Sequence, residues 1–289
     1  MNFSETLKSL WVQSPGKRQG IAAKKYIIKR ANKASIVMNI TLISLAILTI
    51  YGFFTFEYKD VKILEVIAAT AANFKTMLLE PRFNHFDLSK GLYQVGVTLG
   101  LAFLTTLIGG FIALFLGLLA AQNLSSLIVS NIIKGFVAFV RAVPTVLWVL
   151  IFAVAAGLGS VAAVIGMTFH TVGYLIKAYS ESFEEVDAGV IEALKGSGAN
   201  WWQIVFQAVI PSSATYLLSW TFMRFEINYM NAVAMGAAAG AGGIGYELFM
   251  DSSFYFDLRE IGLITYFILA IAVMLEFISI KLKVKLRED

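Results

Sequence analysis

Residue types that support catalysis or metal binding are scarce in this sequence. Cysteine is absent, and the only two histidines are His85 and His170. Disulfides, thiolate metal sites and cysteine nucleophiles are therefore excluded, and two distant histidines do not favour a histidine-rich metal centre. Charged residues make up only 15% of the chain, whereas they make up about a quarter of a soluble domain. We therefore expect no metal site, no resident cofactor and no soluble fold.

Apolar residues are abundant instead. They form 58% of the chain, and the mean hydropathy is +0.75. Several apolar runs approach or exceed the roughly 20 residues that cross a bilayer as a helix. The sequence predicts an all-α fold, a polytopic membrane helical bundle with about six transmembrane helices. The expected spans are 36–56, 92–121, 142–158, 161–179, 210–235 and 261–280.

The basic residues cluster near the two ends of the chain. Residues 1–35 contain eight Lys/Arg and a single acid, Glu5, and residues 281–289 form a second basic tail. By the positive-inside rule both tails are expected in the cytoplasm. The basic region is too long for a secretory signal peptide. Because it directly precedes an apolar span, membrane proximity explains it better than a nucleic-acid-binding arm does.

The segment 57–91 is expected on the outer side of the membrane. It holds five basic and five acidic residues, so it lacks the positive excess of a cytoplasmic loop. Apolar residues recur at helical spacing from Ile63 to Leu78. This pattern predicts an amphipathic helix that lies on the outer surface or against the bundle and ends before Pro81.

The charged stretch 181–207 follows the fourth expected span. Asp187 can cap a short helix, the Gly-Ser-Gly run ending at Gly198 breaks that helix, and Asn200 can cap a second helix that stops before Pro211. The predicted helix–turn–helix suits the docking of a partner protein. A re-entrant or interfacial connector between two spans fits the same pattern equally well.

The same stretch resembles the cytoplasmic loop signature of ABC-importer permeases. That signature is Glu-Ala-Ala, three residues, Gly, nine residues and Ile-x-Leu-Pro. Here Leu194, Ala208 and Ile210 depart from it but stay apolar. The resemblance implies a type I ABC-importer permease fold, with a core at 92–280 and an ATPase-coupling loop at 181–207. The coupling residues that it implies are Asp187, Glu192, Ala193, Gly196, Gly198, Trp201 and Pro211.

Three further strings are similar to those of phosphonate-importer permeases. They are Arg141-Ala-Val-Pro-Thr-Val-Leu-Trp148, Arg224-Phe-Glu-Ile-Asn228 and Gly240-Ala-Gly-Gly-Ile-Gly-Tyr-Glu247. The family implies a homodimer of permeases in a lipid bilayer, two ATPase subunits that bind ATP and Mg, and an extracytoplasmic solute-binding protein. No Gly-x-x-x-x-Gly-Lys-Ser/Thr motif occurs in this chain, so the resemblance implies a non-catalytic transporter subunit.

Ionisable residues inside expected spans are functional candidates because they are costly in lipid. Arg224 and Asn228 are four residues apart and share a helix face, and a guanidinium suits phosphonate oxygens. The alternative for Arg224 is a salt bridge to a neighbouring helix, for example to Glu226 of the other copy. Arg141 and His170 are further candidates for the translocation path, although Arg141 can snorkel and His170 can be a hydrogen-bonded core residue.

A glycine-rich run follows the fifth expected span. It is interpreted as an outer gate or an anion-contacting loop, or alternatively as a tight turn packed against the second copy. Its residues are Gly240, Gly242, Gly243 and Gly245. Two alternative functions stay open: a permease for methionine, a sulfonate or another small organic solute, and a stand-alone secondary transporter or channel.

Overall fold

The computed structural model describes residues 33–55 and 62–288. The chain divides into two units, residues 1–62 and 63–289, which are described separately. The first unit contributes the apolar helix α2 (Lys33–Thr55), whose 23 residues are enough to cross a bilayer once. Most of the expected basic cytoplasmic tail, residues 1–32, lies outside the described residues.

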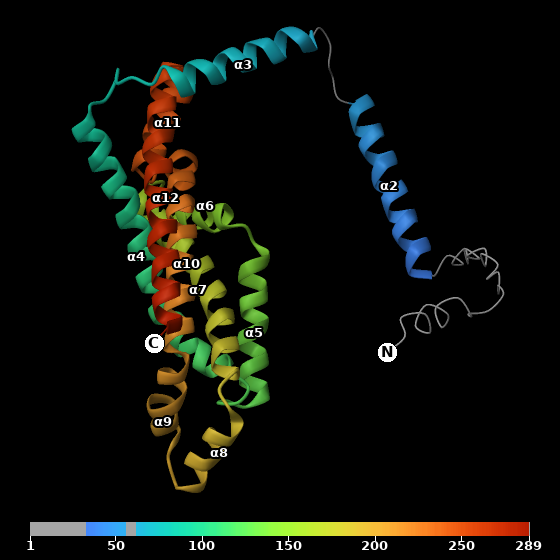
Figure 1. The fold of residues 1–289 in the computed structure, drawn as a ribbon, viewed down its shortest axis with the longest axis vertical. Coiled ribbons are helices and arrows are strands. Elements are labelled where there is room, and N and C mark those ends of the chain that lie inside the picture. Colours follow the sequence, from blue (N-terminus) through green and yellow to red (C-terminus); the bar gives the residue numbers. More distant parts are fainter. Residues whose placement is uncertain (1–32, 56–61, 289) are drawn as a thin grey trace, which may run out of the picture. The chain divides into compact units, whose positions relative to one another are not determined.

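The described part of the second unit is built of helices and short connections, without strands (Figure 1). Its segments Val205–Val209 and Asp251–Tyr255 are π-helical turns, labelled η1 and η2. The other helices are α3 (Ile63–Leu79), α4 (Leu88–Ala120), α5 (Leu127–Ala142), α6 (Thr145–Ala156), α7 (Ser160–Glu184), α8 (Ala188–Gly196), α9 (Trp201–Ile204), α10 (Ile210–Ala239), α11 (Ile244–Met250) and α12 (Leu258–Glu288).

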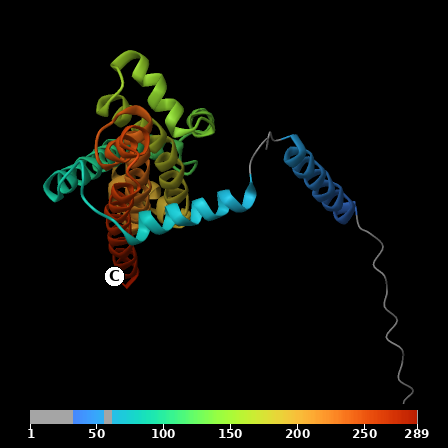
Figure 2. The ribbon, with the colours of Figure 1, turned by 90° about the horizontal axis from the view of Figure 1, so that it is seen from above.

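Long helices form the centre of the bundle. Helix α4 packs against α7, and α10 packs against α4, α7 and α12 (Figures 1 and 2). Helices α8 and α9 lie at one end of this bundle, hereafter the α8 end, and α3 crosses the start of α12 at the opposite end, hereafter the α3 end. There the Tyr266 hydroxyl of α12 donates a hydrogen bond to the Leu78 carbonyl of α3.

Among the described residues, four helices are long and apolar enough to cross a membrane: α2, α4, α7 and α12. The bent pair α5 and α6 would make a fifth crossing. Helix α10 has 30 residues, but Arg224, Glu226 and Asn228 lower its hydropathy. About six spans were expected from the sequence because the segment of α10 is long enough to cross a bilayer and has apolar flanks.

The third span was expected at 142–158, with its entrance tilted or kinked at Pro144, but the structure has two separate helices that meet at this proline. The axes of α5 and α6 differ by 90°, and α6 has only 12 residues, about 18 Å of helix against a bilayer core of about 30 Å. Pro144 disfavours the helical conformation at Val143, which is extended with ψ 125°. The Trp148 indole N–H donates to the Val140 carbonyl at 3.0 Å and fixes this corner.

The expected helix end before Pro211 is also wrong. Helix α9 continues through η1 into α10, with Pro211 in the first turn of α10. In this wider turn the Ile210 N–H bonds to the Val205 carbonyl. The π turn makes room for a proline ring that would clash with the carbonyl four residues earlier in a regular helix.

The contact between α6 and α7 predicts a large effect of one added methyl group. A Cβ at Gly166 would lie 2.5 Å from the Val149 Cα, whereas a Cβ at Gly135 of α5 would meet no atom within 4 Å. We expect Gly166→Ala to lower stability by about 1–3 kcal/mol through overpacking. Gly135→Ala should leave stability unchanged or raise it, since Ala favours helices.

The midpoint of thermal unfolding of the purified protein in detergent measures both effects. Equal midpoints for the two variants would contradict the close α6–α7 contact.

Candidate translocation site

Arg224 lies near the middle of α10 and is almost fully buried, with 3% of its surface exposed. Its Nε donates a hydrogen bond to the Thr171 hydroxyl of α7 at 3.2 Å, and its guanidinium lies 5.0 Å from the centre of the Tyr174 ring. Its buried Nη2 has no hydrogen-bond partner. Hence part of the guanidinium can still bind an acceptor.

Arg141 and His170 meet Arg224 at the same place. Arg141, in the last turn of α5, lies 5.9 Å from the centre of the same Tyr174 ring. His170 lies one turn before Tyr174 on α7 and interacts electrostatically with both arginines. Its buried Nδ1 has no hydrogen-bond partner among the described residues. The structure therefore brings together three residues that the sequence placed in or beside three different spans.

No carboxylate among the described residues balances the charge of the two arginines in this cluster. In the part of the chain that the structure describes, neither Arg224 nor Arg141 forms an ion pair with a carboxylate. Glu226 interacts with Glu276 of α12 instead. A cavity of about 130 Å³ opens beside the cluster. It is lined by Arg141, Tyr174, Lys177, Ala178, Glu181 and Trp220. Glu181 pairs with Lys177 at 3.5 Å, so an anion entering this cavity would chiefly meet the guanidinium of Arg141.

Asn228 shares a face with Arg224, as the spacing predicted, but it has a structural role here. The Thr171 hydroxyl donates to Asn228 Oδ1 at 3.1 Å, and Asn228 Nδ2 donates to the Thr106 hydroxyl of α4 at 2.9 Å. These bonds join α4, α7 and α10 in the core. Sequence reasoning missed Thr171, which no spacing indicated, and Tyr174, whose only signal was its position four residues after His170.

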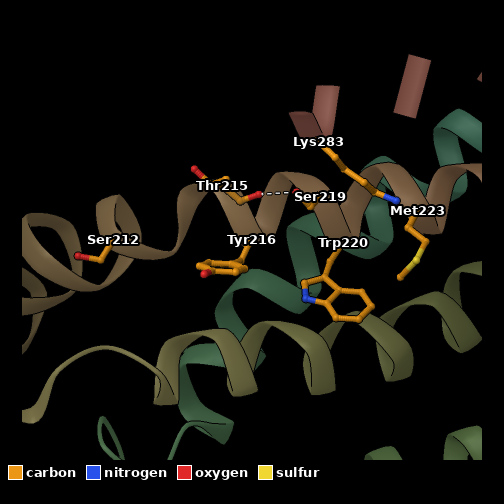
Figure 3. A pocket seen from close by; sticks show the side chains of 7 residues that line it. All are labelled: Ser212, Thr215, Tyr216, Ser219, Trp220, Met223 and Lys283. Atoms are coloured by element: carbon orange, nitrogen blue, oxygen red, sulfur yellow. Dashed lines mark hydrogen bonds between the residues drawn. The ribbon is translucent and has the colours of Figure 1, made fainter. Parts of the chain in front are cut away.

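A polar groove of about 690 Å³ runs along the first half of α10 (Figure 3). The Ser219 hydroxyl donates to the Thr215 carbonyl at 2.8 Å, and Lys283 reaches the groove from α12. The lining residues are Ser212, Thr215, Tyr216, Ser219, Trp220, Met223 and Lys283. Trp220 lines both this groove and the smaller cavity, so the two hollows adjoin.

The expected helix–turn–helix is present at the α8 end. Asp187 caps α8 by accepting the Gly189 N–H at 2.6 Å. Gly198 has φ +86°, a conformation that other residues adopt at a cost. Asn200 and Gln203 form a reciprocal capping box, with bonds of 3.0 Å and 2.7 Å, that starts α9.

This element is joined firmly to the bundle and also exposes apolar side chains. The Trp201 indole N–H donates to the Leu124 carbonyl, between α4 and α5, at 2.8 Å. Val190, Trp202 and Phe206 are exposed and large, and Trp202 stacks on Phe206. Glu192 is also exposed, as are Ala193 and Gly196. Exposed apolar residues on a rigid projection are typical of a docking surface.

The glycine-rich run is shorter than expected, because α10 continues to Ala239. Gly240, Gly242 and Gly243 have positive φ and form a tight turn. The Ile244 N–H then bonds to the Thr98 hydroxyl of α4 at 2.9 Å. Gly245 is buried, and a Cβ there would lie 1.8 Å from the Val233 carbonyl oxygen. The turn therefore packs closely on α10 and α4.

Comparison with known proteins identifies relatives of this bundle. The chain is 31% identical over 202 residues to the phosphate-import permease protein PhnE of Mycolicibacterium smegmatis. It is 30% identical over 183 residues to the phosphite transport system permease protein PtxC of Stutzerimonas stutzeri. These matches cover 68% and 63% of this chain, but only 37% and 66% of the relatives' own lengths.

More distant matches include methionine permeases, such as MetP of Bacillus subtilis, which is 27% identical over 157 residues. Among solved structures, the methionine ABC transporter MetNI in an inward-facing conformation gives a TM-score of 0.61 at 19% identity. The match covers 69% of this chain and 95% of that one. At this identity the likeness shows the fold, a type I ABC-importer permease bundle.

The family model for "binding-protein-dependent transport system inner membrane component" matches residues 113–285, from the second half of α4 almost to the end of α12. The matched range contains Arg224, Arg141, His170 and the whole α8–α9 element. The chain therefore belongs to the family of inner-membrane components of binding-protein-dependent transport systems, the permeases of ABC importers.

Proposed function

We propose that this permease carries a phosphonate, phosphite or related phosphorus oxyanion across the membrane. The observation that carries the proposal is the buried guanidinium of Arg224, which has a free Nη2 and no carboxylate partner within the described residues. A buried charge without a partner is costly unless a ligand or water compensates it. Planar guanidinium groups match the oxygens of phosphorus oxyanions. The relatives named as phosphate and phosphite permeases agree with this chemistry.

The proposed path runs through the positive cluster and along α10. An oxyanion would reach Arg224 and Arg141 in the bundle and then pass the hydroxyl groups of the α10 groove toward Lys283. Hydroxyl and ammonium groups can donate hydrogen bonds to the anion at each step. The groove opens on one side of the single chain, and a second copy of the permease would close it as a homodimer.

The α8–α9 element is proposed to couple this path to two cytoplasmic ATPase subunits, which would bind ATP and Mg. Its exposed Trp202 and Phe206 supply the apolar contact, and the capped helices on both sides of Gly198 make it rigid enough to transmit force. The α8 end would then face the cytoplasm. The α3 end would face an extracytoplasmic solute-binding protein, and the Gly240–Gly245 turn would act as an outer gate.

The first transport prediction concerns the geometry of Arg224. Arg224→Lys keeps a positive charge but loses the planar fork. We expect the KM for phosphite or methylphosphonate uptake by the reconstituted importer to rise at least about tenfold, the effect of one lost charged hydrogen bond. The matched control is Arg259→Lys, which alters an exposed ion pair with Glu80 at the α3 end.

Unchanged KM in Arg224→Lys, with normal assembly, would make Arg224 a structural residue. Uptake of methionine rather than a phosphorus oxyanion by the wild-type importer would reject the proposed substrate class.

The second transport prediction concerns coupling. A Cβ at Gly196 or Gly198 would meet no atom within 4 Å, but only Gly198 has a positive φ. Gly198→Val should therefore strain the turn between α8 and α9, while Gly196→Val should not. We expect Gly198→Val to lose most ATPase stimulation by the loaded binding protein, and Gly196→Val to retain it. Full stimulation in both variants would make the α8–α9 element a simple connector.

A further prediction concerns the orientation of the helix bundle in the membrane. Because the chain has no native cysteine, single introduced cysteines can report it directly. Ser197 and Ser89 are both exposed, the first at the α8 end and the second at the start of α4. In intact cells an impermeant thiol reagent should label Ser89→Cys but not Ser197→Cys. Labelling of Ser197→Cys from outside would reverse the proposed orientation.

A further inference from the structure

The α3 end contains a compact group of ionisable side chains that transport does not use. The connector between α3 and α4 meets the start of α12 at Glu260, which is completely buried. One Glu260 oxygen accepts the backbone N–H groups of Asn84, His85 and Phe86 at 2.9, 2.8 and 3.2 Å. Three backbone donors hold this carboxylate in place and fix the connector against α12.

His85 lies between two carboxyl groups. Its Nδ1 is 2.6 Å from Glu260 Oε2 and 3.8 Å from Asp251 Oδ1 of η2. The ring stacks on Tyr255 with centroids 3.9 Å apart and an interplanar angle of 5°. Because the stack and the Glu260 contact fix the ring, its position relative to the carboxylates is determined.

Asp251 is buried, although one of its carboxyl oxygens lacks a hydrogen-bond partner among the described residues. Only 2% of its surface is exposed, yet its Oδ2 has no hydrogen-bond partner. Its carboxyl is also close enough to interact directly with that of Glu260. Two buried carboxyl groups this close repel each other unless a cation or a proton compensates them.

The charges around this group do not cancel. Asp257, His85 and Glu260 each offer a ligand atom, and these atoms lie within 4.8 Å of one another. Asp251 lies outside this group of three but approaches the same imidazole, with its Oδ1 3.8 Å from His85 Nδ1. Within the described residues, the only Lys or Arg paired with them is Arg82, at 4.0 Å from Asp257. Arg259 is held by Glu80 at 2.8 Å.

We propose that His85, Asp251, Asp257 and Glu260 bind a zinc ion at the α3 end. One imidazole and three carboxylates form a mixed nitrogen–oxygen ligand set, which suits zinc; calcium and magnesium prefer oxygen ligands only. The ion would supply the positive charge that buried Asp251 lacks. An adjoining cavity of about 420 Å³, lined by His85 and Asp257 and also by Arg82 and Arg259, would be its route of entry.

Zinc at this position would join three segments that are distant in the sequence. His85 belongs to the α3–α4 connector, Asp251 begins η2, and Asp257 and Glu260 flank the start of α12. The ion would therefore restrain α3 and the connector relative to the bundle. This proposal does not depend on the identity of the transported solute.

The test is zinc binding to the full-length protein in detergent, with any histidine tag removed and metals stripped by a chelator. Isothermal titration with zinc chloride should show one saturable site per chain, and bound zinc should raise the midpoint of thermal unfolding. Asp251→Asn should weaken zinc binding at least tenfold. The matched control Glu80→Gln, which removes a carboxylate of the same end outside the group, should bind like the wild type.

Absence of saturable zinc binding by the wild type would overturn the proposal, whatever the variants do. It would also be overturned if Asp251→Asn, confirmed as folded by size-exclusion chromatography, bound zinc as tightly as the wild type. Should Asp251→Asn fail to fold, His85→Gln replaces it, because His85 is partly exposed and its substitution spares the buried carboxylates. Undiminished zinc affinity in His85→Gln would equally exclude the proposed site.

Discussion

Arg224 is buried with no carboxylate partner among the described residues, and the rest of this bundle depends on that constraint. A guanidinium inside an apolar helix bundle is costly, and the chain offsets that cost with neutral groups: the Thr171 hydroxyl and the face of the Tyr174 ring. A carboxylate would stabilise the arginine more but would also neutralise the field at the adjoining cavity. The neutral arrangement leaves Arg224 able to attract an anion, which is the property that a path for an oxyanion needs.

The corner at Pro144 places the second cation. Because α5 ends at Ala142 and α6 turns away by 90°, Arg141 lies at a helix terminus beside Tyr174. A straight span through 142–158 would have set Arg141 at a membrane boundary, where it could snorkel to water. A backbone feature that ends one helix thus helps to build the electrostatic site, and the Trp148 to Val140 hydrogen bond maintains it.

The two ends of the bundle are built in different ways. At the α8 end, short-range hydrogen bonds shape the turn, because the cap of Asp187 and the capping box of Asn200 and Gln203 all act within three residues. At the α3 end, Glu260 and Asp251 meet a connector about 170 residues earlier in the chain. The first end can form as a preorganised local unit, whereas the second can form only after the long helices have packed.

The sequence by itself determined the membrane class, the all-α fold, the α8–α9 turn and the shared face of Arg224 and Asn228. These features follow from composition, helical periodicity and caps, which act over a few residues. Only the tertiary structure decided the right-angle corner at Pro144, the continuation of the helix through Pro211 and the meeting of Arg141, His170 and Arg224. It also decided the grouping of His85 with the carboxylates of η2 and α12. Contacts between distant segments depend on how whole helices pack, and a local pattern carries no information about that packing.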